Sequence, residues 1–269
     1  MARPKLPAPP LPSALQAPPP RPGEGNGALT PVDHAKEAGT SVVDWVDERT
    51  SLSGAARWMM FRKVPKGTNW FYTLGSATMF AFLNQAVTGV FLAMFYRPDP
   101  SGGAYESIRH VTNEVFLGQF VRGMHKWGSS VMVILVFLHM GRTFFFGAYK
   151  YPRELNWVIG VVLLILTMTM SFTGYLLPFD QRAYWATIVG VNINGTGPLI
   201  GPYLSDFLRG GGEFGATTLS RFYAIHMLLV PGLLAALIGA HLYLVAKLGT
   251  TAPPWQKAEK NPELREAEA

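Results

Sequence analysis

The chain has 269 residues, a formal net charge of +6 and a composition that is 49% hydrophobic, with long runs that carry no charge. This pattern excludes a soluble globular domain and indicates an integral membrane protein, in which the basic balance reflects topology rather than nucleic-acid binding. The chain has no cysteine, which excludes disulfides, thiolate metal sites, iron–sulfur ligation and thioether attachment of a cofactor.

The amino-terminal part is predicted to lie outside the membrane core. Residues 1–31 contain ten prolines and almost no large apolar side chains, so residues 1–40 are expected to form a disordered tail without the apolar core of a signal peptide. From 41 to 66, apolar and charged residues alternate, with Trp45 and Trp58 interspersed. We expect an amphipathic helix on the inner membrane surface here; the alternative is a soluble helix packed on a partner subunit.

Four segments have the roughly 20 apolar residues that a membrane span requires. They are about Trp70–Tyr96, Val131–Tyr149, Trp157–Leu177 and Phe222–Leu248. The second is expected to begin earlier, near Phe120, because Arg122, His125 and Lys126 fit functional residues on a helix better than a helix boundary. Residues 67–249 are therefore predicted to form one all-α membrane domain, a four-helix transmembrane bundle.

The distribution of lysine and arginine predicts the orientation. The amino-terminal segment, the loop between the second and third spans and the tail from Lys247 hold 16 of the 23 basic residues. Basic residues favour the cytoplasmic side, so both termini are placed in the cytoplasm, and residues 250–269 are expected to form a polar tail.

Some 44 residues, Pro178–Arg221, connect the third and fourth spans on the outer side. Loops of this length are usually functional. Apolar clusters at Tyr184–Val191 and Leu199–Leu208 predict short surface helices that would roof a pocket.

Two pairs of histidines lie along two of the spans, His125 with His139 and His226 with His241. On a regular helix their spacings correspond to rises of about 21 and 22 Å and to net rotations of about −40° and +60°. The two histidines of each pair therefore lie on the same side of their helix at two membrane depths. This arrangement suits two flat metal cofactors stacked across a bilayer, and bis-histidine haem fits best. The alternative for any one histidine is a polar contact between helices, although ionisable residues within spans are rare and usually functional.

Glycines recur at the same interval on the other two spans. Gly75 and Gly89 in the first span, and Gly160 and Gly174 in the third, are each 14 residues apart. A small residue at that interval leaves room for a flat ring at each of two depths.

The alternating direction of the spans assigns these residues to levels. The outer level holds His125, His226, Gly89 and Gly174, and the inner level holds His139, His241, Gly75 and Gly160. Each level is predicted to bind one non-covalent haem through one histidine from each of two helices. Arg122 and Arg142 are the candidate partners of the anionic haem propionates, with Arg221 a weaker one; the alternative for both is an arginine that snorkels to the interface.

At this point the residues resemble the cytochrome b/b6 family, and most of all the short cytochrome b6 type of split quinol oxidoreductase complexes. The resemblance covers about Asp44 to Gly249. The motifs that carry it are Arg122-Gly-Met-His125-Lys-Trp127, His139-Met-Gly-Arg142, Pro152-Arg-Glu-Leu-Asn-Trp157, Gly174-Tyr-Leu-Leu-Pro178 and Thr218-Leu-Ser-Arg-Phe222, together with the 15-residue second spacing.

The resemblance implies a subunit of a proton-translocating Q-cycle enzyme in the cell (inner) membrane. Quinol would be oxidised near the outer haem, in a pocket that Tyr175 and Pro178 partly line. One electron would pass to a Rieske iron–sulfur protein and on to a c-type cytochrome. The other would cross both haems to a quinone at the inner face. The complex is expected to be a homodimer.

Three departures from the family pattern bear on this expectation. The acidic Pro-Glu-Trp-Tyr type motif of the outer site is absent, so a second polypeptide resembling subunit IV should supply it. Thr73 stands where some relatives attach a third haem through cysteine, so a covalent third haem is not expected. Trp58 and Ala246 replace acidic and basic residues near the inner quinone site, whose contacts therefore cannot be carried over.

Two other functions compete with this one. The chain could be the di-haem cytochrome b anchor of a hydrogenase or formate dehydrogenase, which would not explain the two glycine pairs or the long outer loop. It could instead be a transporter whose histidines relay protons or bind a metal ion. A visible spectrum distinguishes a transporter, because it would show no reducible b-type haem.

Overall fold

The computed structural model describes residues 42–50, 54 and 65–254. The chain divides into two compact units, Met1–Arg62 and Lys63–Ala269. In the first unit, residues 42–50 are helical, within the segment predicted to be amphipathic. The remainder of that segment up to residue 64, apart from residue 54, lies outside the described residues, as do most of the predicted tails.

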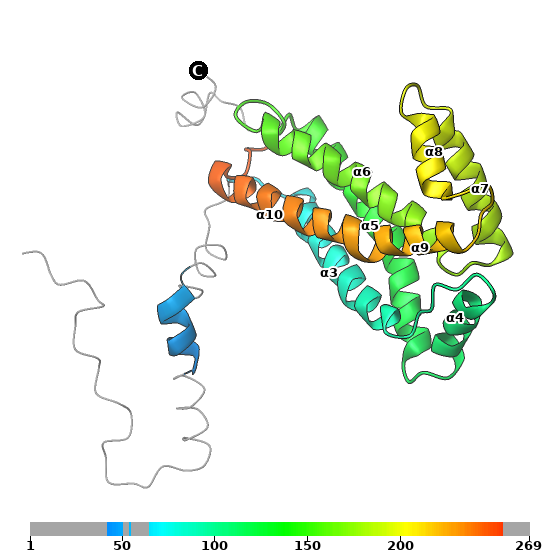
Figure 1. Ribbon diagram of the computed structural model, residues 1–269. Coiled ribbons are helices and arrows are strands. Elements are labelled where there is room, and N and C mark those ends of the chain that lie inside the picture. The colour runs from blue at the N-terminus through cyan, green and yellow to red at the C-terminus, as the bar shows by residue number, and fades with distance from the viewer. Residues whose placement is uncertain (1–41, 51–53, 55–64, 255–269) are drawn as a thin grey trace, which may run out of the picture. The chain divides into compact units, whose positions relative to one another are not determined.

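All the regular secondary structure in the described part of the second unit is helical (Figure 1). Its elements are the 3-10 helix η2 (Trp70–Thr73), α3 (Leu74–Ala93), α4 (Gly103–Asn113), α5 (Gly118–Phe145), α6 (Glu154–Leu176), α7 (Gln181–Gly195), α8 (Gly201–Arg209), α9 (Ala216–Ala224), the π-helical turn η3 (Ile225–Leu229) and α10 (Val230–Leu248). Among the described residues, four segments are long and apolar enough to cross a membrane: Trp70–Ala93, Gly118–Phe145, Glu154–Leu176 and Ala216–Leu248. The predicted class, an all-α protein with four spans, is confirmed, and the second span begins at Gly118, close to the expected residue.

The spans associate as two antiparallel pairs. α3 packs mainly on α5, and α6 packs mainly on α10, alongside which it runs in Figure 1. Many large apolar side chains on the spans point away from their neighbours, among them Phe80, Val87 and Ile165. Such side chains suit contact with lipid, because a bilayer core is as apolar as they are.

The main cluster of buried residues lies where α6 ends and α7, α8 and α9 meet. Leu176, Val191, Leu208, Leu219 and Phe222 belong to it. α7 and α8 confirm the two short helices predicted between the third and fourth spans. Local signals define their ends: the Asp180 carboxylate accepts from the Ala183 backbone N–H at 2.8 Å at the start of α7, and Gly210, at φ +78°, ends α8.

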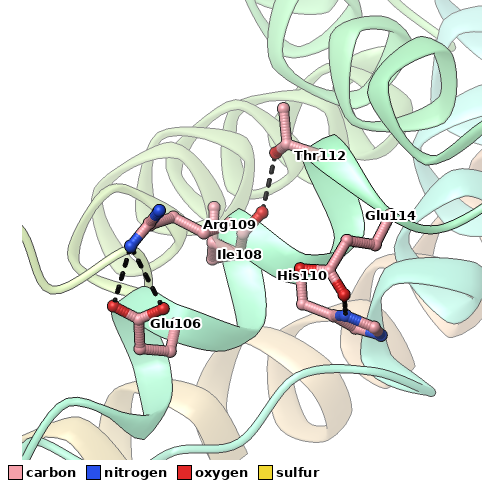
Figure 2. A network of polar contacts seen from close by, with 6 residues as sticks. All are labelled: Glu106, Ile108, Arg109, His110, Thr112 and Glu114. Atoms are coloured by element: carbon pink, nitrogen blue, oxygen red, sulfur yellow. Dashed lines mark hydrogen bonds and ion pairs between the residues drawn. The ribbon is translucent and has the colours of Figure 1, made fainter.

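The helix α4 was not predicted from the sequence. It buries small or branched residues, Ala104, Ser107 and Val111, and its exposed face carries an ion pair between Arg109 and Glu106 and a hydrogen bond between His110 and Glu114. Figure 2 shows these contacts, together with the hydrogen bond that the Thr112 hydroxyl donates to the backbone carbonyl of Ile108. α4 is therefore an amphipathic surface helix in the first interspan connection.

The fourth span contains a wider turn. α9, η3 and α10 are continuous, and η3 is a π-helical turn that begins at Ile225, one residue before His226. A π turn accommodates an extra residue relative to an α-helix. The net rotation of +60° between His226 and His241, expected from a regular helix, is therefore wrong. With the π turn, these two histidines are related as His125 and His139 are, although their spacing is one residue longer.

Candidate functional site

Histidines from different span pairs meet at two levels. His125 on α5 faces His226 on η3, with 6.4 Å between ring centroids and 79° between ring planes. His139 on α5 faces His241 on α10 at the same separation and angle. The structure thus brings together the histidines predicted to act as partners, and the equal geometry at both levels follows from the π turn.

The separation fits one metal ion between each pair of imidazoles. Metal–imidazole bonds are about 2 Å long, so two of them on opposite sides of one metal place the ring centroids roughly 6 Å apart. Two imidazoles per level suit a metal whose other ligands come from a flat macrocycle, as in bis-histidine haem. The residues present therefore fit the cofactor that the spacing predicted.

Each predicted glycine lies against one of the four histidines. The distances from a Cβ atom built on the glycine to Cε1 of the histidine are 2.5 Å (Gly174 to His226), 3.1 Å (Gly75 to His139), 3.2 Å (Gly89 to His125) and 3.8 Å (Gly160 to His241). The glycines were expected to make room for a macrocycle. Among protein atoms, the group nearest to each missing side chain is an imidazole, so the glycines also let the histidine-bearing helices approach.

A cavity of about 330 Å³ adjoins the pair of His125 and His226. Seven of the residues predicted for the outer haem and quinol sites line it, Arg221 not among them: Gly89, Arg122, His125, Gly174, Tyr175, Pro178 and His226. Lys126, expected to be a functional residue of the second span, lines it as well, and so do Asp180 and Arg182, which were not predicted. Cations predominate among the charged residues of its lining, which favours an anionic group in the cavity.

Tyr96 also lines this cavity and was missed from the sequence. Its hydroxyl donates to the backbone carbonyl of Leu177 at 2.6 Å, which joins the end of the first span to the end of α6. Burial, and to a lesser degree the nearby Tyr223, raise the pKa of Tyr96 above its usual value. Tyr96 therefore remains a neutral hydrogen-bond donor at physiological pH.

Arg142 lies one turn after His139 on α5. Its guanidinium is 3.7 Å from the ring centroid of Tyr72 and 5.0 Å from that of Phe146. Within the described part of the chain, its buried Nε and Nη2 make no hydrogen bond. Buried N–H donors without a partner fit an anionic group, as expected for a propionate. Arg221, the weaker candidate, is instead bonded to the backbone carbonyl of Phe207.

Two hydroxyls beside the histidines were also missed. Oγ1 of Thr88 lies 2.9 Å from Nδ1 of His125, and Oγ1 of Thr173 lies 3.2 Å from Nδ1 of His226. A signal for them exists in the sequence, because each threonine directly precedes a predicted glycine.

These features define a class, that of helical membrane proteins which hold flat metal cofactors between histidines of paired spans. Comparisons with known proteins identify the family within it. The model of the family described as "Cytochrome b/b6/petB" matches residues 59–249 of this chain. The chain is 42% identical over 213 residues to a cytochrome b6 of Heliobacterium modesticaldum, covering 78% of this chain and 100% of that protein.

Two further relatives agree. The chain is 43% identical over 218 residues to a menaquinol:cytochrome c reductase cytochrome b subunit of Geobacillus thermodenitrificans, covering 78% and 97% of the two chains. A solved structure of a hyperthermophilic respiratory Complex III matches with a TM-score of 0.72 at 31% identity, covering 82% of this chain. The chain spans 59% of the length of that solved chain. This chain therefore belongs to the cytochrome b/b6 family, whose members bind haem b.

Proposed function

We propose that this chain is the di-haem cytochrome b subunit of a Rieske/cytochrome b quinol oxidoreductase, with quinol oxidised at the outer face and quinone reduced at the inner one. When bound, the haems would supply a path for single electrons between the two faces. The observation that carries the proposal is the clustering of seven of the residues predicted for the outer site around one cavity, with a second facing histidine pair further along the same spans.

Four histidines would hold the two haems. His125 and His226 would coordinate the outer one, and His139 and His241 the inner one. Opposed imidazoles with equal spacing at both levels support this assignment. Arg122 at the cavity and Arg142 beside Tyr72 would bind the propionates.

Tyr175 and Pro178 would form part of the quinol pocket. Both line the same cavity as His125 and His226, so a quinol held against them would lie close to the outer haem. Tyr96 fixes the neighbouring backbone at Leu177 and would keep this wall in place.

The partners and the location complete the proposal. A Rieske protein and a c-type cytochrome would accept electrons, and the relative from Geobacillus, a menaquinol:cytochrome c reductase subunit, supports this. A polypeptide resembling subunit IV would complete the outer site; the support is the absence of the acidic Pro-Glu-Trp-Tyr type motif from this sequence and its 42% identity to a cytochrome b6. We place the complex in the cell membrane as a homodimer, with both termini in the cytoplasm.

The test is a redox-controlled visible spectrum of the gently purified complex, with its subunits identified. Two b haems per copy of this chain, reduced by quinol and accompanied by a Rieske protein, are expected. Absence of reducible b haem would overturn the proposal in favour of a transporter. Two haems copurifying with a hydrogenase or formate dehydrogenase subunit would favour the anchor function.

The haem should be extractable from this subunit. Thioether attachment requires a thiol, and the chain has no cysteine, with Thr73 where some relatives carry one. Acid–acetone is expected to remove all its haem, and the denatured subunit should not stain for haem peroxidase activity on a gel. A haem-staining band shown by peptide mapping to be this chain would contradict the prediction.

The π turn predicts that one residue can be deleted from the fourth span without the loss of either haem. Deleting Leu228, an exposed residue of η3, should convert the turn to regular α-helix while His226 and His241 keep facing their partners. Both haems should be retained in the reduced-minus-oxidised spectrum. Deleting Leu228 and Leu229 together would rotate one histidine by about 100° relative to the other, and one haem should be lost. Equal spectra for the two deletions would contradict the role assigned to the turn.

A further inference from the structure

Thr88 and Thr173 occupy matching positions against the histidines of one level. Thr88 on α3 contacts Nδ1 of His125, and Thr173 on α6 contacts Nδ1 of His226, at 2.9 and 3.2 Å from Oγ1. Both threonines are buried, with 6% and 0% of their surface exposed. Two hydroxyls from different spans therefore reach the same ring nitrogen of the two facing histidines.

The backbone fixes the direction of these hydrogen bonds. The hydroxyl of Thr88 donates to the carbonyl of Asn84 at 2.6 Å, and that of Thr173 donates to the carbonyl of Thr169 at 2.8 Å. A hydroxyl whose proton is engaged in this way offers its lone pairs, so Nδ1–H of the histidine donates and the threonine accepts. The carbonyl of Met170, 3.1 Å from Nδ1 of His226, is a second acceptor.

This arrangement sets the tautomer of both histidines. With the proton on Nδ1, Nε2 is left with its lone pair free to coordinate a metal. A ligating histidine that donates its other N–H to an acceptor is also held in orientation and becomes a more basic ligand.

The other level does not have these hydroxyls. The residues that precede its glycines, Gly75 and Gly160, are Leu74 and Ile159, whose side chains cannot accept a hydrogen bond. Nδ1 of His241 is buried and has no hydroxyl beside it; the acceptor that lies near it in the described part of the chain is the backbone of Asn156. The two levels therefore share their ring geometry but differ in the acceptors offered to their histidines.

We propose that Thr88 and Thr173 are positioning residues that lower the reduction potential of the haem held by His125 and His226 relative to the haem held by His139 and His241. More basic ligands favour the oxidised, more positive iron, and hydrogen bonding around the ligands is one of the ways a protein sets haem potential. The threonines thereby favour electron flow from the first level to the second. This inference rests on the proposed function, because it requires haem at both levels.

The test is a spectroscopic redox titration of the purified complex carrying Thr88→Val, Thr173→Val or both. Valine keeps the branched shape and removes the acceptor. In the double variant, the potential of the haem at His125 and His226 should rise by about 59 mV, a tenfold change in electron sharing between the levels, while the other haem stays unchanged. Thr88→Ser and Thr173→Ser retain the hydroxyl and should leave both potentials near their original values.

Two further variants keep the test specific. Thr167 is buried on α6 and its hydroxyl donates to the carbonyl of Leu163 at 2.8 Å, so Thr167→Val removes a comparable hydroxyl and should shift neither potential. Ile159→Thr introduces a hydroxyl at the matching position of the other level and should lower the potential of the haem held by His139 and His241.

The outcomes separate this inference from the proposed function. Both haems present with unchanged potentials in the double valine variant would overturn the inference, as would an equal shift in Thr167→Val. If the valine variants fail to hold haem, an Ile159→Thr protein with an unchanged potential would overturn it. A complex that contains no b haem at all would contradict the proposed function instead.

Discussion

Replacing His226 with leucine should remove the outer haem and leave the inner one in place. His125→Leu should have the same effect, because the two rings face each other across 6.4 Å and both would be needed to hold the haem. His139→Leu or His241→Leu should remove the inner haem. Haem content per chain should fall from about two to one in each variant, and steady-state quinol oxidation should be lost because the transmembrane path is broken.

The measurement is the haem-to-protein ratio together with a redox titration that separates the two haems. His110→Leu is the matched control, because His110 lies on α4 and pairs with Glu114 at the exposed surface. It should leave both haems unchanged. Loss of different haems from His125→Leu and His226→Leu would show that the pairing of the histidines is wrong.

The glycines should differ sharply in their tolerance of a single methyl group. A Cβ at residue 174 would lie 2.5 Å from Cε1 of His226, so the imidazole must move, whereas a Cβ at residue 160 would lie 3.8 Å from His241, an ordinary contact distance. Overpacking of this kind typically costs about 1–3 kcal/mol. Gly174→Ala is therefore expected to lower outer haem content and to shift its spectrum, and Gly160→Ala should be close to neutral.

Haem content and the thermal loss of the reduced α-band would measure this difference. Gly75→Ala and Gly89→Ala should fall between the two extremes, since their distances are 3.1 and 3.2 Å. Leucine at residue 89 or 174 should be worse than alanine, because it adds branched atoms to the same space. Equal haem content in Gly174→Ala and Gly160→Ala would contradict the packing role inferred for these glycines.

Hydropathy and residue spacing predicted the architecture because a bilayer requires apolar segments of a minimum length, and helical periodicity determines which residues share a face. The four spans follow from apolar length, and the partners among the histidines follow from helical periodicity. α4 was missed because it is a helix of 11 residues with little apolar surface, so a search for long apolar segments passes over it. The π turn was missed because spacing alone does not tell whether a helix is regular along its whole length.

The finer parts of the site depend on contacts between spans. Glycine spacing indicated a close approach, but the partner of each glycine, an imidazole edge, depends on how α3 packs on α5 and α6 on α10. The acceptor role of Thr88 likewise depends on a neighbour in another helix, and a threonine in an apolar span is otherwise common. The hydrogen bond from Arg221 to the backbone carbonyl of Phe207 could not be predicted from the sequence either.

The pairing of the spans has a consequence for how the protein is assembled. Helix contacts are extensive within each antiparallel pair and sparse between the pairs, yet each facing set of histidines takes one ring from either side of that division. Two hairpins of this kind can insert into the bilayer separately and associate afterwards. A ligand that binds only the associated form stabilises that form in proportion to its concentration and affinity. The supply of haem would then control how much of the protein reaches the associated form. Hairpins that are not joined by the cofactor would be the form open to degradation.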